Sequence, residues 1–339
     1  MSRPTVAWYV HHHGSGHLGR LRAIAPHLDA DVVALSSLAE PAGLPAHVDW
    51  VRLDRDDEVD AAGRRPADAD PAAGGLLHWA PLLHPGHRGR LARIARELDA
   101  RGAATIVVDV SVEVTVFARL LGVPPVLVAQ PGVRDDEPHA LGLRAAARVL
   151  APWPADVVPA AHLEPVRGRV VFTGGISRFD GREAPGVARE GVLVLGGRGG
   201  TGVTAEHVDA AARATPGRRW TVLGPGGAWS DDPWHELTAA GTVVSFAGQN
   251  SVADLAVAGA RAVVVPQDRP FDEQAVTARA LGRAGLAVVE PAWPEPERWP
   301  EVLDRAQSLQ PDWSVWGTAG AAARAAEAIE DVARHGGRS

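Results

Sequence analysis

The sequence predicts an α/β protein made of two doubly wound parallel-sheet domains that face a cleft, and three observations support this fold class. Short apolar segments alternate with helical segments along the chain, which is typical of parallel strands covered on both faces. The alternation pauses at residues 176–188, a stretch rich in Gly, Pro and charge, and then begins again. The chain has 339 residues, a length that suits two domains of ordinary size.

The first half of the chain supplies four expected strands before the series ends at residues 170–175. The strands are short apolar runs at residues 6–10, 31–36, 105–108 and 125–129. The helices expected between them have apolar residues three or four positions apart and cover residues 18–28, 88–101 and 112–121. Residues 54–73 are acidic and have no clear period, so they predict a surface loop.

The second half repeats this pattern and ends in an Ala-rich helical tail. Its expected strands are residues 192–195, 220–223, 243–246, 262–265 and 287–289. The predicted organisation is a first domain over residues 1–175, an interdomain linker over residues 176–188, a second domain over residues 189–318 and a C-terminal helix over residues 319–339.

Composition excludes several classes of function. The chain has neither Lys nor Cys, which removes Schiff-base chemistry, P-loop nucleotide binding, disulfides and thiolate catalysis. Its net charge is -7 and it has no dense basic run, so nucleic acid is not expected as a partner. No apolar run approaches the roughly 20 residues of a membrane helix, and no secretory segment precedes the first strand. We therefore expect a cytoplasmic enzyme without a transmembrane segment.

One segment has the features of a helix start that binds a diphosphate. Residues 245–254 read Ser-Phe-Ala-Gly-Gln-Asn-Ser-Val-Ala-Asp, a glycine turn before a helix expected to begin at Asn250 or Ser251. Unpaired N–H groups and the positive dipole end attract a diphosphate there, so the expected contacts are Gly248, Gln249, Asn250 and Ser251. Asp254 lies one turn further on, where a carboxylate can accept hydrogen bonds from ribose hydroxyls.

A second polar group follows the next apolar strand. Asp272, Glu273 and Gln274 come after residues 262–265 and open a helix. Carboxylate oxygens and an amide at the carboxyl end of a strand provide what hexose hydroxyls need. Together the two segments predict a site for a nucleotide sugar.

The first strand runs into a loop that contains the expected catalytic base. Residues 11–20 read His-His-His-Gly-Ser-Gly-His-Leu-Gly-Arg, in which Gly14 and Gly16 let the backbone turn tightly and approach the donor before a helix begins near His17. Imidazole ordinarily titrates near neutral pH, which suits a general base. A carboxylate would orient it, and two lie at a strand end and a helix start expected to flank this loop: Asp109 and Glu113.

A third loop, residues 196–202, reads Gly-Gly-Arg-Gly-Gly-Thr-Gly and lies between a strand and a helix. Its glycines allow a close backbone approach to phosphates, and its Arg and Thr add charge and a hydroxyl. Because the chain has no Lys and no Mg-binding sequence, leaving-group charge must be neutralised by Arg, N–H groups and a helix dipole. The expected contacts in this loop are Gly197, Arg198, Gly199, Gly200 and Thr201.

Further polar and aromatic residues leave alternatives open. Four histidines lie within seven residues, namely His11, His12, His13 and His17. His12 would lie on the opposite strand face from its neighbours, so few of them can converge, and we expect no metal. A polar cluster is a candidate lining for an acceptor cleft and consists of His78, His84, His87 and Arg88. Two aromatic residues suit either stacking or burial: Trp229 and Trp234.

At these residues the chain resembles the GT-B glycosyltransferases, notably the MurG-type and UDP-glycosyltransferase families. In the donor domain the matching positions are Gly248, Ser251, Asp254, Pro266, Glu273, Gln274 and Ala278. The Gly-x-Gly-His turn of these enzymes is matched by residues 14–17. The chain departs from the pattern at Phe246, where many of these enzymes have a His. The architectural resemblance covers the whole chain, and the specific matches cover residues 14–20, 196–202 and 245–278.

The resemblance implies two Rossmann-like domains, of which the first binds the acceptor and the second the donor. It also implies transfer of a sugar from a nucleotide sugar, expected to be a UDP-sugar, to an acceptor hydroxyl. It implies His17 as the base, aided by Asp109 or Glu113. The helix start and the glycine loop would hold the diphosphate, Asp254 the ribose, and Glu273 with Gln274 the sugar. It further implies that no metal or cofactor is needed and that the last helix crosses back onto the first domain.

Two alternatives remain open, and a third is disfavoured. A nucleotide-sugar hydrolase would use the same donor residues with water in place of the acceptor. A catalytically silent GT-B-like auxiliary protein is kept open by Phe246. A sugar 2-epimerase shares the fold, but its Gly-Thr-Arg-Pro-Glu type of motif is absent from residues 11–20.

Overall fold

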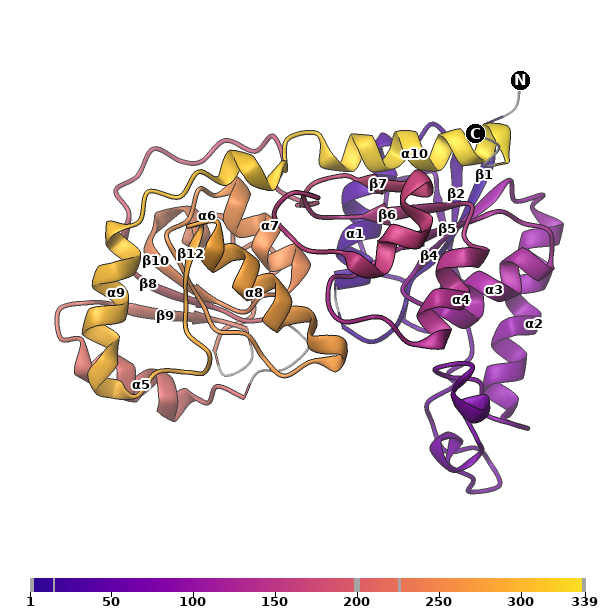
Figure 1. Ribbon diagram of the computed structural model, residues 1–339, viewed down its shortest axis with the longest axis horizontal. Helices are drawn as coiled ribbons and strands as arrows, with labels where there is room; N and C mark the ends of the chain where they lie inside the picture. Colours follow the sequence, from indigo (N-terminus) through magenta and orange to yellow (C-terminus); the bar gives the residue numbers. More distant parts are fainter. Residues whose placement is uncertain (1–2, 15, 198–201, 225–226, 337–339) are drawn as a thin grey trace.

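The computed structural model describes residues 3–14, 16–197, 202–224 and 227–336, and shows two lobes side by side (Figure 1). Within the described residues the first lobe has a seven-stranded sheet in the order β3-β2-β1-β4-β5-β6-β7, with all neighbouring strands parallel. Its strands are β1 (Thr5–Tyr9), β2 (Asp31–Ser36), β3 (Val48–Arg52), β4 (Thr105–Asp109), β5 (Pro125–Val128), β6 (Arg148–Ala151) and β7 (Val170–Phe172).

The second lobe has a five-stranded parallel sheet among the described residues, in the order β12-β11-β10-β8-β9. Its strands are β8 (Glu190–Leu195), β9 (Trp220–Leu223), β10 (Ala240–Ser245), β11 (Ala262–Val264) and β12 (Ala287–Val289). The α/β class with two doubly wound parallel sheets, predicted from the sequence, is therefore confirmed.

Helices cover both faces of each sheet. The first lobe contains α1 (Gly16–Ile24), α2 (Pro85–Ala100), α3 (Val112–Leu120) and α4 (Glu137–Ala145). The second contains α5 (Ala205–Ala214), α6 (Trp234–Ala239), α7 (Gln249–Val257), α8 (Glu273–Arg283) and α9 (Trp299–Ser308). The chain ends in α10 (Ala321–His335).

The apolar strand sequences reflect burial on both faces. In β1, Val6 and Trp8 pack with α1 and α10, whereas Ala7 and Tyr9 pack on the other face with α2 and α3. All four side chains are at most 2% exposed. A strand buried on both faces loses the alternation of polar and apolar residues, which is why these strands were recognisable as short apolar runs.

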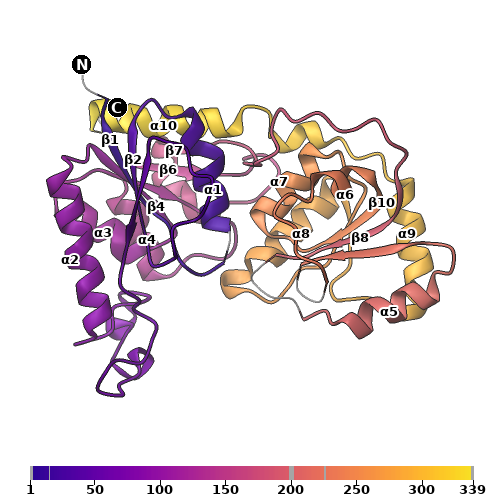
Figure 2. The ribbon, with the colours of Figure 1, turned by 180° about the vertical axis from the view of Figure 1, so that it is seen from behind.

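The chain crosses from the second lobe back to the first before α10, which lies along the first lobe (Figure 2). In α10, Ile329 and Val332 are fully buried in the core on one face of the first sheet. Asp331 of this helix pairs with Arg148 at 2.7 Å. This arrangement joins the two lobes at a second place besides the linker.

The structure adds elements that the sequence patterns did not reveal. The edge strand β3 and the short strands β6 and β7 belong to the first sheet. The helix expected at residues 88–101 begins earlier, at Pro85, because the His84 side chain accepts a hydrogen bond from the backbone N–H of His87 and caps it. None of the helices in the described part of the chain is long and apolar enough to cross a bilayer.

Strand order determines where the loops meet. In the first sheet the order reverses between β1 and β4, and in the second between β8 and β10. Open parallel sheets bind ligands at such switch points, at the carboxyl ends of the strands. The loops that follow these four strands are the ones in which the sequence placed most of the expected site residues.

Candidate active site

A cavity of about 720 Å³ lies between the two lobes and is lined by loops from both sheets. Ten of the expected site residues line it: Gly14, Gly16, His17, Gly197, Gly248, Gln249, Asn250, Ser251, Glu273 and Gln274. Four others are absent from its described lining, namely Asp109, Glu113, Asp254 and Asp272. The remaining four lie outside the described residues: Arg198, Gly199, Gly200 and Thr201. The cavity thus brings the expected base and the expected donor contacts together.

His17, Asp109 and Arg20 form a buried polar group at the switch point of the first sheet. Asp109 ends β4 and is fully buried, and its Oδ1 lies 2.9 Å from His17 Nδ1. Its carboxylate also accepts hydrogen bonds from Arg20 Nε at 2.9 Å and Arg20 Nη2 at 3.3 Å. Burial alone would raise the pKa of Asp109, but the Arg20 and His17 charges and hydrogen bonds hold it well below its usual range.

The partners of His17 define what its ring can do. A carboxylate beside Nδ1 favours the tautomer that carries its proton there, which leaves Nε2 with a free lone pair. Among the described residues, none forms a hydrogen bond with His17 Nε2, and the residue lines the cavity. The distance between His17 Nδ1 and Asp109 Oδ1 suits a hydrogen bond, but the angle does not, because the ring is tilted away from the carboxylate oxygen. The geometry is that of an oriented base facing the cleft.

Glu113, the other carboxylate considered as partner of His17, is placed elsewhere. Its Oε1 accepts hydrogen bonds from the backbone N–H groups of His78 and Trp79, at 2.8 and 3.0 Å. Its Oε2 accepts from Ser111 Oγ at 3.0 Å. These hydrogen bonds make Glu113, in the first turn of α3, an anchor for the segment around His78, and the carboxylate that the structure brings to His17 is Asp109.

Val110 adds a feature that no sequence pattern indicated. It follows Asp109, lines the cavity and has a φ of 87°. A β-branched residue in this region is strained, and such strain is concentrated at functional sites. The strained turn directs the chain away from β4 immediately after the carboxylate that contacts His17.

On the opposite wall, the first turn of α7 presents unpaired backbone N–H groups. The helix begins at Gln249 with Gly248 as its N-cap, and no side chain caps it. The glycine has an extended conformation and no side chain, so the N–H groups of residues 249–251 remain accessible from the cleft. Such a helix start favours an anionic group through its hydrogen-bond donors and its dipole.

Asn250 joins the two walls of the cleft. Its Nδ2 donates a hydrogen bond to the Gly16 carbonyl oxygen at 3.0 Å, so this side chain links the second lobe to the first. The approach is close enough that a Cβ at position 19 would lie 2.9 Å from Asn250 Nδ2, which explains Gly19. The contact holds the start of α7 directly opposite the loop that carries His17.

Glu273 and Gln274 lie at the start of α8 and face the cleft. Gln274 Oε1 accepts a hydrogen bond from the Gln267 backbone N–H at 2.9 Å, which fixes the side chain. Burial raises the pKa of Glu273, while Arg134, Arg20 and His17 oppose that rise. Asp272 instead adopts a left-handed conformation with φ 54° and supplies no side-chain cap to α8.

Asp254 is buried against the interdomain linker. Its Oδ1 accepts a hydrogen bond from Ser177 Oγ at 2.6 Å, and only 9% of the residue is exposed. Burial raises its pKa to about 6, although the Ser177 hydrogen bond and Arg178 act in the opposite direction. Its expected contact with ribose stays a prediction. Because burial disfavours the ionised form, this carboxylate lowers the stability of the fold, as ionisable groups at functional sites commonly do.

We expect Asp254→Asn to stabilise the protein at high pH. A carboxyl group whose pKa is higher in the folded than in the unfolded state favours folding while it is protonated. For Asp254 this contribution is complete below the unfolded pKa of 3.8 and is lost as pH rises through about 6. The amide cannot ionise, so the variant should gain up to roughly 3 kcal/mol at pH 8 and nothing at pH 4. Urea unfolding at both pH values measures this, with the exposed Asp209→Asn as control. An equal gain at both pH values would refute the burial effect.

Other expected residues have structural roles. Trp234 is 3% exposed and its Nε1 donates to the Glu183 carbonyl oxygen, so it is a core residue, whereas Trp229 is 47% exposed. Phe246 packs into the core on one face of the second sheet and also lines the cavity. Of the polar cluster proposed as acceptor lining, only His78 lines the cavity, and His84 caps α2.

Two groups of side chains in the described part of the chain place three potential metal ligands within 4.8 Å of one another. They are His12, His13 and Asp57, and His78, Asp136 and His139. In each group a guanidinium, which can only donate, faces one histidine: Arg90 Nη2 lies 3.3 Å from His12 Nδ1, and Arg134 Nη1 lies 2.8 Å from His139 Nε2. The other nitrogen of each ring must then carry the proton, so neither histidine has a lone pair left for a metal.

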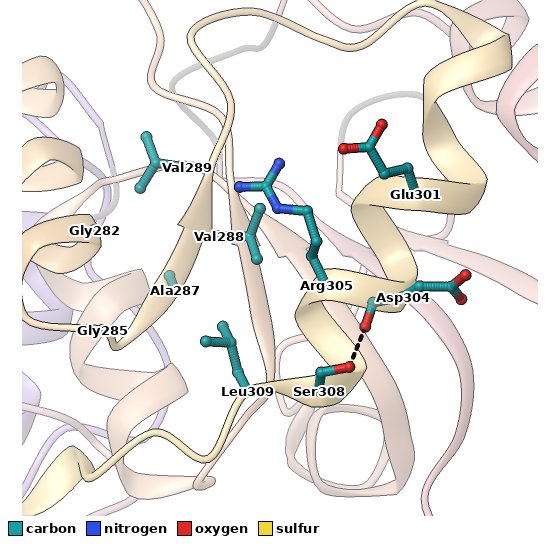
Figure 3. A pocket seen from close by; sticks show the side chains of 10 residues that line it. All are labelled: Gly282, Gly285, Ala287, Val288, Val289, Glu301, Asp304, Arg305, Ser308 and Leu309. Atoms are coloured by element: carbon teal, nitrogen blue, oxygen red, sulfur yellow. Dashed lines mark hydrogen bonds between the residues drawn. The ribbon is translucent and has the colours of Figure 1, made fainter.

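A larger and more open hollow of about 940 Å³ lies on the far edge of the second sheet (Figure 3). It lies between β12 and α9, where Arg305 pairs with Glu290 and Asp304 with Arg218, while Glu301 is exposed at its surface. No histidine lines it among the described residues. Because a binding site combines a hollow with convergent polar groups, we place the active site in the smaller cleft.

Comparison with known proteins shows the family to which the chain belongs. No family model matches the chain. It is similar to the UDP-N-acetylglucosamine–N-acetylmuramyl-(pentapeptide) pyrophosphoryl-undecaprenol N-acetylglucosamine transferase of Rubrobacter xylanophilus. The two sequences are 30% identical over 262 residues, which cover 65% of this chain and 76% of that protein. The chain belongs to the MurG-type and UDP-glycosyltransferase superfamily, and it is a glycosyltransferase.

Solved structures show the same fold. The glycotransferase of kitacinnamycin superposes with a TM-score of 0.62 at 17% identity, covering 97% of this chain and 99% of that one. The calicheamicin glycosyltransferase CalG4 gives 0.62 at 16% identity, over 99% of both chains. MurG of Acinetobacter baumannii gives 0.61 at 16% identity, over 97% of this chain and 100% of that one. The GT-B fold expected from the sequence is therefore confirmed.

Proposed function

We propose that the protein transfers a sugar from a nucleotide sugar, with a UDP-sugar as the first candidate, to a hydroxyl of its acceptor. The donor's diphosphate binds at the start of α7, its ribose is held by Asp254, and its sugar is held by Glu273 and Gln274. The choice of UDP rests on the resemblance and on the Rubrobacter relative, whose name specifies UDP-N-acetylglucosamine.

In the proposed reaction the acceptor hydroxyl attacks the anomeric carbon while His17 Nε2 takes its proton. The bond between that carbon and the diphosphate oxygen breaks, and the nucleoside diphosphate leaves with the bonding electrons. The N–H groups and the dipole at the start of α7 stabilise the negative charge that develops there. Asp109 orients the His17 ring and stabilises the imidazolium that forms.

One observation carries this proposal: a histidine at hydrogen-bonding distance from a buried carboxylate faces an uncapped helix start across a single cavity. A nucleotide-binding protein without catalysis would need only the helix start. The pairing of His17 with Asp109 supplies a proton acceptor where the donor's reactive carbon would lie.

Product analysis tests the proposal. The protein is incubated with each of a panel of UDP-, GDP- and TDP-sugars, with and without a mixture of alcohol acceptors, and the products are separated by mass. A glycosylated alcohol together with free nucleoside diphosphate is the expected result. Free sugar, formed equally with or without alcohols, would identify a hydrolase instead.

We further propose that transfer needs no metal ion, because in each candidate group one histidine, His12 or His139, has its lone pair occupied by Arg90 or Arg134. Treatment with EDTA followed by gel filtration should leave the rate within about twofold of the untreated enzyme, since helix N–H groups carry the phosphate charge. Loss of activity that returns on adding Mg²⁺ or Zn²⁺ would show that a metal takes part.

A further inference from the structure

A second pairing of histidine with carboxylate lines the same cleft, on the side of the first lobe. His78 and His139 both contact Asp136, and both histidines line the cavity. The ring of Phe271, from the second lobe, packs against His139 at 4.6 Å and His78 at 5.6 Å between ring centroids. The proposed reaction gives this group no role.

Arg134 sets the protonation of the group. Its Nη1 lies 2.8 Å from His139 Nε2 and can only donate, so that nitrogen accepts. His139 Nδ1 must then carry the proton and donate to Asp136 Oδ1 at 2.6 Å. Burial, followed by the charge of Arg134, lowers the pKa of His139 to about 4, which keeps this ring neutral. His139 therefore supports Asp136 and has no free lone pair.

Asp136 in turn orients His78. Its Oδ2 lies 3.1 Å from His78 Nε2, and a carboxylate that already accepts from His139 acts as an acceptor here too. Burial would raise the pKa of Asp136, but hydrogen bonds from the His139 backbone, His78 and the His139 ring lower it, so it is ionised at neutral pH. His78 then donates from Nε2 and keeps a lone pair on Nδ1, to which no described residue donates.

The backbone at His78 is fixed as well as its ring. Glu113 accepts the N–H groups of His78 and Trp79, which ties this part of a long loop to α3. A fixed imidazole with one free lone pair on the wall of a cleft is a built hydrogen-bond acceptor. In His17 the carboxylate lies beside Nδ1 and Nε2 is free, whereas in His78 the carboxylate lies beside Nε2 and Nδ1 is free.

We propose that His78 Nδ1 binds a second hydroxyl of the acceptor, so that the preferred acceptors carry at least two hydroxyl groups. One hydroxyl faces His17 and reacts, and the other donates to His78 and positions the molecule. Phe271 supplies an apolar surface beside this second contact. The inference rests on the proposed function, because it concerns the acceptor of that reaction, and it makes His78 a specificity-determining residue.

The tautomer of His78 can be measured without any acceptor. Long-range ¹H–¹⁵N correlation spectra of the full chain at pH 8.5, where imidazole is ordinarily neutral, report which ring nitrogen carries the proton. Signals lost in His78→Asn assign the residue. We expect a proton on Nε2 and none on Nδ1, and a loss of this preference in Asp136→Asn, which keeps the helix cap. A proton on Nδ1 would overturn the proposal.

Kinetics with paired alcohols test the acceptor contact itself. Phenol is compared with catechol, and cyclohexanol with cis-1,2-cyclohexanediol, using the donor identified by product analysis. Wild-type kcat/KM should favour each diol by about 3- to 10-fold, mainly through KM, and in His78→Ala the ratio of diol to mono-alcohol kcat/KM should fall to about one. His78→Asn should retain part of it, because its amide oxygen replaces Nδ1.

Two controls separate the possible failures. His335→Asn, on the surface of α10, should preserve both rates and the diol advantage. An advantage that persists in His78→Ala, or an equal loss for mono-alcohols and diols, would overturn the role of His78. If His17→Asn failed to reduce transfer to both kinds of alcohol, the proposed function itself would be at fault, whatever the result for His78.

Discussion

Replacing His17 with Asn should lower the rate of sugar transfer by a factor of about 10² to 10⁴, the usual contribution of a general base. The shorter side chain places an amide near the position of Nδ1, so contact with Asp109 survives while Nε2 is lost. Nucleotide affinity should stay within about twofold, because the donor contacts lie on the opposite wall. Initial rates of nucleoside diphosphate release, with calorimetric binding of the nucleotide, measure the two effects separately.

The control for this variant is a histidine far from the cleft. His335→Asn changes the same side chain on the surface of α10 and should leave both rate and affinity unchanged. The assignment of His17 as the base fails if its replacement leaves the rate within a few-fold of wild type. A parallel loss of rate and of nucleotide binding would point to a structural role for the loop.

The largest effect on stability is expected for Arg20→Met. The variant removes the guanidinium that pairs with the fully buried carboxylate of Asp109 and leaves His17 as its remaining close partner. Removing one partner of a buried ion pair costs about 3–5 kcal/mol, because an uncompensated charge stays in the interior. Urea unfolding at pH 8 should show a loss of this size.

The pH dependence identifies the cause of that loss. In the wild type the pKa of Asp109 is depressed, so its ionisation contributes stability above about pH 4, and this contribution is lost as pH falls further. Without Arg20, burial raises the pKa of Asp109 instead, so the penalty should be largest at pH 8 and shrink towards pH 4. The double variant Arg20→Met with Asp109→Asn should recover much of the stability at pH 8. A loss independent of pH, or no recovery, would indicate a packing defect.

The sequence predicted the fold because local patterns determine most of it. Strands buried on both faces, such as β1 and β4, appear as apolar runs, and their order fixes the switch points. The strands that were missed are at or near the sheet edge, where β3 alternates Val48 and Val51 with exposed residues over a short length. Short, half-buried strands leave a weak pattern in a single sequence.

Site residues on loops after β1, β10 and β11 could be predicted, because glycine turns and helix starts are local signals. The carboxylate partner of His17 could not be chosen from the sequence, since Asp109 and Glu113 are close neighbours in the chain. Only tertiary contacts show that Asp109 meets His17 while Glu113 turns to the backbone at His78.

Three other features depend on contacts between distant segments. Arg20 belongs to the segment at residues 14–20 that matches the family pattern, but no sequence pattern indicated that it pairs with Asp109, 89 positions further along the chain. Asp254 matched the family pattern, but its burial against Ser177 required the linker to fold over α7. The orientation of His78 depends on Asp136, 58 positions along the chain.

The most direct test of the central claim is calorimetric titration of the folded protein with UDP, GDP and TDP. We predict that one nucleotide binds, and that Asp254→Ala weakens this binding while His17→Asn does not. If none of the three nucleotides binds to correctly folded protein, the cleft is not a nucleotide-sugar site, and the chain is a GT-B protein that serves another role.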